Sequence, residues 1–363
     1  MWRQGGLSAL ATLVKTQGSS YRRPGARLLL GVQNEYAGTI SGGCLEAEVV
    51  RKASWLVREG AVVKRYSTEF DDTAEIPFGL GCGGVVDLLL EPTDTPEFKA
   101  LMCALEGAIA GDEAIVLTWL PSEGRGLARA VLTAKGDFLF ASESLMESTL
   151  VHVRPMVMYG LEALPKEIFM ERLVAPQRFF VLGAGDDAKP LVSMGAVLGW
   201  TMNILDCRAQ LARPERFPEA ENVRVIHSPS SDLQDIKRND AVVLMTHSYE
   251  QDRILLTAVL PLRPSYLGLL GARHRTALLI SEVSKKLACS IADCCEHIHA
   301  PVGLDLGGDG PEAIALAVIA EVQAVRMGKP ANSRKLSPQD VESYLKEGGS
   351  ALHLQALCAL DAR

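Results

Sequence analysis

Residues 178–188 read Arg-Phe-Phe-Val-Leu-Gly-Ala-Gly-Asp-Asp-Ala, an apolar run that stops at a glycine turn. Residues 188–198 follow with apolar side chains at helical spacing, and residues 200–205 form a second apolar run. Strand, glycine turn, helix and strand in this order are typical of a nucleotide-binding βαβ unit. The segment therefore predicts a Rossmann-like, doubly wound parallel sheet in the C-terminal half of an α/β protein.

The glycine turn has the spacing Gly-x-Gly-x-x-Ala. Gly183 is expected to make the tight turn, Gly185 to let the backbone approach a pyrophosphate, and Ala188 to allow close packing of helix on strand. Asp206 ends the second apolar run about 20 residues after the turn, where an acidic residue meets a ribose hydroxyl in dinucleotide-binding folds. Similar turns occur in α/β folds that bind nothing there, so the fold is predicted and nucleotide binding is left open.

Composition narrows the class of protein. The chain has 363 residues, enough for two domains, and a net charge of -7, so it lacks the basic surface of a nucleic-acid-binding or polybasic membrane protein. We see no leader peptide and no apolar run of the ~20 residues that span a bilayer, and we expect a cytoplasmic protein. The eight cysteines follow no disulfide framework, which indicates thiols that pack, react or bind metal.

The domain boundary is expected near Ala175, giving domains at residues 1–175 and 176–330 and a tail at 331–363. For the first domain we expect a helix end running into a strand at residues 7–16, and residues 155–176 to be irregular. Further elements there are a hairpin at 26–32 and 36–40, helices at 46–59 and 94–109, and strands at 61–66, 85–90, 114–119 and 128–133. In the second domain the third to sixth strands are expected at 223–226, 241–245, 266–270 and 298–303, with helices at 252–260, 275–287 and 311–327.

Two glycine-flanked cysteines in the first domain are candidates for chemistry. Cys44 follows Gly42 and Gly43 at the start of a predicted helix, where the helix dipole and free backbone N–H groups favour a thiolate. Cys82 lies among four glycines that leave its thiol accessible. Both cysteines are next to predicted core strands, so both can face one pocket. The alternative is that each is a small residue at a tight junction, since cysteine is among the most buried residue types.

Several basic groups are candidates for anion binding. Arg22 and Arg23 lie in a loop with serines, proline and glycine, which suits a short anion-facing loop but also an ordinary solvated turn. In the second domain, Arg273 and Arg275 follow one predicted strand, and His247 follows another. Because ligands of open parallel sheets bind outside the carboxyl ends of the strands, we expect these side chains to face the same site as the glycine turn.

Three cysteines and two histidines fall within residues 289–299. Their spacing matches no paired zinc motif, and adjacent cysteines with alternating histidines leading into a strand cannot all face one ion. We therefore do not expect a metal site there.

The motifs of the two predicted domains resemble those of the XdhC/CoxI family, whose members are accessory and maturation factors of xanthine dehydrogenase and carbon monoxide dehydrogenase. The resemblance covers about 330 residues. In the first domain it rests on residues 18–25, 38–46 and 81–84, and these motifs are specific to the family. In the second domain it rests on residues 183–188, Asp206 with Arg208, 216–218, Thr246 with His247, 268–271 and 300–307.

The resemblance implies a chaperone that binds molybdenum cofactor, supports its sulfuration and inserts it into a xanthine dehydrogenase-type enzyme. It adds Asp305 to the candidate cofactor-binding residues, and Cys44 and Cys82 as sulfur contacts to molybdenum. The implied partners are molybdoenzyme subunits and a cysteine desulfurase, and we expect a homodimer. Some relatives have a histidine in the glycine turn, where this chain has Asp186 or Asp187.

Two other functions remain open. Gly183, Gly185 and Asp206 also fit an NAD(P)-dependent oxidoreductase, and Arg208 would leave room for a phosphorylated ribose. A scaffold without catalytic activity, which only docks the client enzyme, fits the same motifs. The sequence favours an accessory factor over a catalyst and leaves the client enzyme unidentified.

Overall fold

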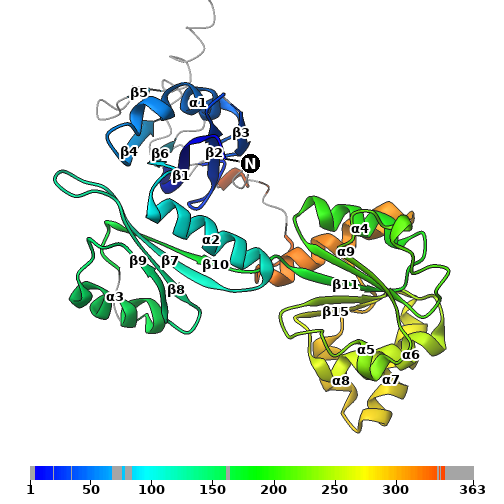
Figure 1. Cartoon of the computed structure of the whole chain (residues 1–363). Helices are drawn as coiled ribbons and strands as arrows, with labels where there is room; N and C mark the ends of the chain where they lie inside the picture. The colour runs from blue at the N-terminus through cyan, green and yellow to red at the C-terminus, as the bar shows by residue number, and fades with distance from the viewer. Residues whose placement is uncertain are drawn as a thin grey trace, which may run out of the picture. The chain divides into compact units, whose positions relative to one another are not determined.

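The structure is a computed structural model and describes residues 5–18, 20–33, 35–67, 76–77, 84–160, 164–332, 335 and 337–339 (Figure 1). The chain divides into two compact units. The first includes Met1–Ala175 and the second is Pro176–Lys335. Each unit has its own hydrophobic clusters and is described separately.

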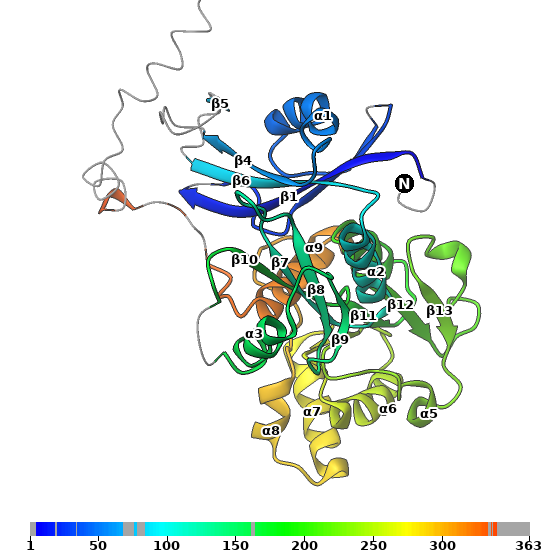
Figure 2. The same cartoon turned by 60° about the vertical axis from the view of Figure 1, so that its left-hand side comes forward.

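The first unit opens with a six-stranded sheet in the order β3-β2-β1-β6-β4-β5. Its elements are β1 (Leu7–Gly18), β2 (Arg27–Gly31), β3 (Tyr36–Gly38), α1 (Cys44–Leu56), β4 (Val62–Ser67), β5 (Ile76–Pro77) and β6 (Gly84–Pro92). The long central strand β1 buries both of its faces: Ala9, Ala11 and Leu13 belong to the cluster that α1 covers, whereas Leu10 belongs to the cluster around α2 (Figure 2).

A second, four-stranded sheet in the order β10-β7-β8-β9 completes the first unit. Its elements are α2 (Pro96–Ala110), β7 (Ala114–Trp119), β8 (Ala128–Thr133), β9 (Phe138–Ala141), α3 (Glu147–Tyr159) and β10 (Ile168–Leu173). Arg129 and Glu91 form a fully buried bidentate ion pair that links β8 to β6, with N···O distances of 2.9 and 3.0 Å. This charged pair therefore joins the two sheets inside the unit.

Two expectations for the first unit were wrong. Residues 7–16 contain no helix end, because β1 runs through all of them as the strand between β2 and β6. Residues 155–176 are not irregular: α3 continues to Tyr159 and β10 pairs with β7. The helix was obscured because Pro155 interrupts its pattern. The strand was obscured because it lies at a sheet edge and its two charged residues, Glu171 and Arg172, are adjacent, so the segment lacks the alternation of a half-buried strand.

The second unit contains a five-stranded, entirely parallel sheet in the order β13-β12-β11-β14-β15. The strands are β11 (Arg178–Leu182), β12 (Thr201–Asp206), β13 (Asn222–Val225), β14 (Ala241–Leu244) and β15 (Tyr266–Leu269). The helices are α4 (Ala188–Val197), α5 (Pro229–Asp232), α6 (Tyr249–Val259), α7 (Arg273–Leu287), α8 (Ile291–His297) and α9 (Pro311–Arg326). Figure 1 shows α4 and α9 on one face of the sheet and α5 to α8 on the other.

Strand β11 shows why helices cover both faces of this sheet. Phe179 and Val181 are fully buried in the cluster with α4 and α9, and Phe180 and Leu182 are fully buried in the opposite cluster with α6 and α7. A parallel strand that is apolar at every position needs cover on both sides. The predicted α/β class with a C-terminal Rossmann-like sheet is confirmed.

The predicted sixth strand at residues 298–303 is reduced to an isolated parallel bridge between Gly268 and His299. The residues before it also differ from expectation. Residues 291–297 form the short helix α8 rather than leading directly into a strand. Its start has a capping box of Ser290 and Asp293, a helix signal that is present in the sequence itself.

Candidate functional site

The glycine turn of the second unit follows β11. The strand order changes direction between β11 and β14, so the turn lies at the switch point of the sheet. Gly183 has a φ of 131°, and a Cβ atom added there would lie 2.4 Å from the carbonyl oxygen of Met245. Ala188, the first residue of α4, is fully buried against the sheet. Both positions therefore require small residues for packing reasons alone.

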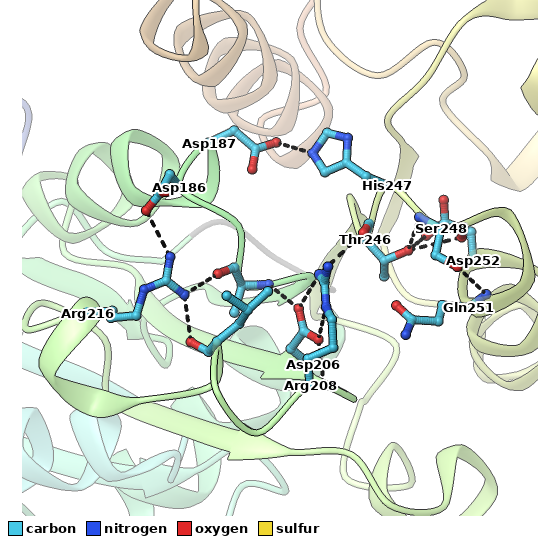
Figure 3. Close-up of polar contacts among 12 residues, drawn as sticks. Asp186, Asp187, Asp206, Arg208, Arg216, Thr246, His247, Ser248, Gln251 and Asp252 are labelled. Atoms are coloured by element: carbon cyan, nitrogen blue, oxygen red, sulfur yellow. Dashed lines mark hydrogen bonds and ion pairs between the residues drawn. The ribbon is translucent and has the colours of Figure 1, made fainter.

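Asp206 ends β12 with its carboxylate buried beneath this turn. Its Oδ2 accepts a hydrogen bond of 2.7 Å from the backbone N–H of Ala184, and Arg208 contacts both carboxylate oxygens through Nε and Nη2 at 2.9 and 2.8 Å. Burial acts to raise the pKa of Asp206, but these hydrogen bonds outweigh it and hold the pKa below its usual range. Arg208 also donates to the carbonyl of Thr246 at 3.3 Å, so it bridges the ends of β12 and β14 (Figure 3).

Two further carboxylates lie at the start of α4. Asp186 is paired with Lys189 at 2.7 Å and with Arg216 at 2.8 Å, and hydrogen bonds from these two cations lower its pKa. Asp187 contacts the Nε2 atom of His247 at 2.7 Å (Figure 3). The helix N-terminus, which favours negative charge, therefore already has two anionic side chains of its own beside it.

His247 reaches Asp187 from the end of β14 with a left-handed backbone, φ 61°, and its side chain is 61% exposed. The residue before it, Thr246, is buried and donates a 2.7 Å hydrogen bond to Asp252. Asp252 in turn accepts a 2.7 Å hydrogen bond from Arg275. This buried network commits Arg275 to a structural partner, and no sequence pattern had pointed to Asp252.

The other predicted groups of the second unit are more open. Arg273 and His274 begin α7, are exposed, and have no side-chain partner among the residues that the structure describes. Asp305 is exposed in the segment before α9. That segment is anchored at its start, where Glu321 accepts hydrogen bonds from the N–H of Gly303 at 2.9 Å and from the hydroxyl of Tyr266 at 2.5 Å.

In the first unit, one carboxylate organises the turn that leads into α1. Glu46 is 6% exposed and accepts from the N–H groups of Ile40, Ser41 and Gly43 at 3.0, 2.8 and 3.1 Å. The hydroxyl groups of Thr39 and Ser41 also donate to it. Burial opposes ionisation, but these hydrogen bonds prevail and lower the pKa of Glu46 to about 2. A fixed carboxylate therefore shapes the Gly42–Gly43 turn and places Cys44 as the first residue of α1.

The arginine loop lies beside this turn. A Cβ atom added to Gly42 would meet the ring of Tyr21 at 3.9 Å, so the two loops are neighbours. Arg22 and Arg23 are exposed, and no described residue forms a hydrogen bond or ion pair with either guanidinium group. Residues 21–26 line a hollow of about 400 Å³. The structure thus brings the loop that carries Arg22 and Arg23 next to the Gly42–Gly43 turn through Tyr21, whereas the sequence had placed the two only in separate loops.

Cys82 lies outside the described residues, and of Cys44 only the backbone is described. Their predicted roles as sulfur contacts stay a prediction. Across the described ranges, no group of three or more His, Cys, Asp and Glu residues is arranged to hold a metal ion. In the same part of the chain, no helix combines the length and apolar character needed to cross a bilayer.

Comparison with known proteins finds a family match in each of the two units. Residues 179–322 match the XdhC Rossmann domain, and residues 1–67 match the XdhC and CoxI family. The chain belongs to the XdhC and CoxI family. The resemblance predicted from the motifs is therefore confirmed, and the Gly42–Gly43 turn and the Gly183 turn lie inside the two matched regions.

Relatives of this XdhC-family chain cover nearly its whole length. A Bacillus subtilis (strain 168) protein, named as a probable xanthine dehydrogenase subunit, is 26% identical over 322 residues, covering 88% of this chain and 93% of that protein. PaoD of Escherichia coli (strain K12), named a molybdenum cofactor insertion chaperone, is 25% identical over 333 residues, covering 90% and 86%. A crystal structure from Bacillus halodurans, described as a xanthine dehydrogenase, has a TM-score of 0.73 at 25% identity and covers 92% and 95%.

Proposed function

We propose that this XdhC-family chain is an accessory protein that binds molybdenum cofactor, supports its sulfuration and inserts it into a xanthine dehydrogenase-type enzyme. The observation that carries the proposal is the pair of exposed arginines, without side-chain partners among the described residues, in the loop that adjoins the glycine turn of the first unit. Family membership and the similarity to PaoD, whose name states cofactor insertion, support it.

The chemistry of the cofactor suits this arrangement. Molybdopterin is a phosphorylated, anionic dithiolene, so a carrier needs positive charge for the phosphate and close backbone approach for the pterin. Arg22 and Arg23 form no side-chain hydrogen bond or ion pair with any described residue, so no such contact would have to break before a phosphate binds. Gly42 and Gly43 present backbone without side chains, and Cys44 occupies the first helical position of α1, directly after this turn. Cys44 and Cys82 would supply the soft sulfur donors.

The test is cofactor retention by the purified full chain under anaerobic conditions, measured as molybdenum and pterin per chain. We expect the Arg22→Ala/Arg23→Ala variant to bind more weakly by about tenfold for each lost charge-assisted contact. Arg58→Ala removes an exposed arginine of the same unit and serves as the matched control. Equal retention by both variants, or no retention by the wild-type chain with its cysteines intact, would overturn the proposal.

A second candidate is an NAD(P)-dependent oxidoreductase, which is favoured by the parallel sheet and the Gly183 turn. Two features of that turn count against it. A ribose hydroxyl would have to displace Arg208 from Asp206, and a pyrophosphate would meet Asp186 and Asp187 at the start of α4. Titration with NADH and NADPH separates the two functions: saturable binding that Asp206→Ala weakens would make the oxidoreductase the better candidate.

The partner side of the proposal needs its own experiment. We expect the cofactor-loaded chain to restore activity to a molybdenum-free client enzyme, and the unloaded chain not to do so. A chain that co-purifies with the client while binding neither cofactor nor nicotinamide would instead be a docking scaffold. Adding a cysteine desulfurase to the loaded chain tests whether sulfuration takes place before insertion.

A further inference from the structure

Two cysteine sulfur atoms meet where α7 gives way to α8. The Sγ atoms of Cys289 and Cys294 are 3.3 Å apart. Ser290 is the N-cap of α8, so Cys289 is the residue before the cap and Cys294 is the fourth residue of the helix. Side chains at these two positions pack together in the hydrophobic staple that fixes how a chain enters a helix. The staple of α8 therefore consists of two thiols.

Reciprocal hydrogen bonds hold this geometry. The hydroxyl of Ser290 accepts from the N–H of Asp293 at 3.0 Å, and the carboxylate of Asp293 accepts from the N–H of Ser290 at 3.2 Å. The N–H of Cys289 also bonds to the carbonyl of Ser284 at 3.1 Å, at the end of α7. The cap therefore fixes the backbone of Cys289 on one side and that of Cys294 on the other. The two sulfur atoms need to approach by little more than 1 Å to reach a disulfide bond length of about 2.05 Å.

The two thiols differ in access. Cys294 is 1% exposed and belongs to the cluster that packs against the sheet, whereas Cys289 is half-buried. Both line a hollow of about 360 Å³ together with Arg263 and His297. Cys295, the next residue along the helix, is exposed. A small oxidant can therefore reach the Cys289 sulfur through the hollow. Once Cys289 is oxidised, the Cys294 sulfur lies next to it.

We propose that Cys289 and Cys294 form a reversible disulfide across the cap of α8 when the protein meets a peroxide. The Cys289 thiolate attacks one peroxide oxygen, the O–O bond breaks, and Cys289 becomes a sulfenic acid while the other oxygen leaves as hydroxide and takes up a proton to form water. Cys294 then attacks the Cys289 sulfur, the S–O bond breaks, and the Cys294 proton leaves with the hydroxyl as a second water. Peroxide is reduced, the two thiols are oxidised, and a dithiol reductant reverses the change.

The environment of the pair supports this order of attack. Burial, together with contact with Cys289, raises the pKa of the Cys294 thiol to about 11, so Cys294 is the poorer nucleophile toward peroxide at neutral pH. It becomes reactive only once a sulfenic acid has formed next to it. Cys295 projects from a different side of the helix, since adjacent helical residues do not share a face.

The experiment treats the full chain with hydrogen peroxide at neutral pH, blocks the remaining thiols, and maps the disulfides by mass spectrometry. A protease that cleaves before aspartate cuts at Asp293 and separates Cys289 from Cys294 and Cys295. We expect an intact-mass loss of about 2 Da and a cross-link between the two resulting peptides, both reversed by dithiothreitol.

Variants assign the bond without depending on any single substitution. Cys295→Ser should keep the cross-link, because only the exposed neighbour is removed. Cys289→Ser and Cys294→Ser should each abolish it, and Cys103→Ser on α2 is the remote control that should keep it. The proposal is overturned if wild-type Cys289 and Cys294 remain reduced, oxidise separately to sulfinic acids, or if the cross-link disappears in Cys295→Ser.

Discussion

Replacing Glu46 by glutamine should loosen the turn before α1 without unfolding the first unit. The carboxylate receives three N–H and two hydroxyl donors, and a glutamine amide would present its own NH₂ group to some of these donors. The pKa of Glu46 is lowered from 4.5 to about 2, and one pKa unit corresponds to about 1.4 kcal/mol. With allowance for solvent screening, the ionised carboxylate contributes about 2 to 3 kcal/mol to the turn.

This stabilisation has a defined pH range. Because the pKa in the folded chain lies below the unfolded value, the contribution is fully present above about pH 4.5 and is lost as the pH falls toward 2. In Glu46→Gln it is absent at every pH. A loss of 2 to 3 kcal/mol corresponds to about 30- to 150-fold faster amide exchange if the turn opens locally.

Hydrogen–deuterium exchange followed by mass spectrometry measures this directly for peptides covering residues 38–50. The matched control is Glu59→Gln, which removes the same charge from an exposed position after α1. We expect faster exchange only in Glu46→Gln, with the peptides of β1 unchanged, and only the wild-type and control turns should lose protection between pH 4.5 and 2. Equal protection of the turn in both variants at neutral pH would refute the role assigned to Glu46.

Three further substitutions test the buried groups of both units. Arg129→Met should destabilise the first unit by about 3 to 5 kcal/mol because it leaves Glu91 buried without its partner, and adding Glu91→Leu should restore most of this in calorimetric unfolding; a double variant as unstable as the single one would contradict the explanation. Gly183→Ala should cost at least about 2 kcal/mol in urea unfolding of the second unit, more than Gly199→Ala, which has a positive φ but no close neighbour. Asp206→Asn should cost about 1 to 3 kcal/mol at neutral pH because it removes a buried charge-assisted pair, and a stability unchanged from wild type would show that the pair contributes nothing.

The sequence predicted the second unit better than the first because of how each is built. Strands β11, β14 and β15 are buried on both faces, so each appears as a short apolar run next to glycine or polar residues. In the first unit, β10 is an edge strand whose charged residues Glu171 and Arg172 are adjacent, and α3 contains a proline. Only pairing with β7 establishes β10 as a strand, and pairing is not visible in the local pattern.

The candidate site shows the same division. The residue types of the Gly183 turn and of the Gly42–Gly43 turn made both turns candidate ligand sites, which stays a prediction, and with the flanking motifs they indicated the family. The sequence did not show that Asp206 would be held by Arg208 and by the backbone of Ala184, partners that a ribose hydroxyl would have to displace.

What the amino-acid sequence determined by itself was therefore the α/β class, the Rossmann-like second unit and the membership of the XdhC and CoxI family. Those features depend on local patterns of apolar residues and glycine, which survive without knowledge of contacts. The tertiary structure alone decided which charged groups have partners. Arg275 is paired with Asp252, whereas Arg22 has no side-chain partner within the described part of the chain. The tertiary structure also decided which cysteines meet, as Cys289 and Cys294 do. Hydrogen-bond partners and burial are set by residues that are distant in sequence or by cap geometry, and both become visible only when the chain is folded.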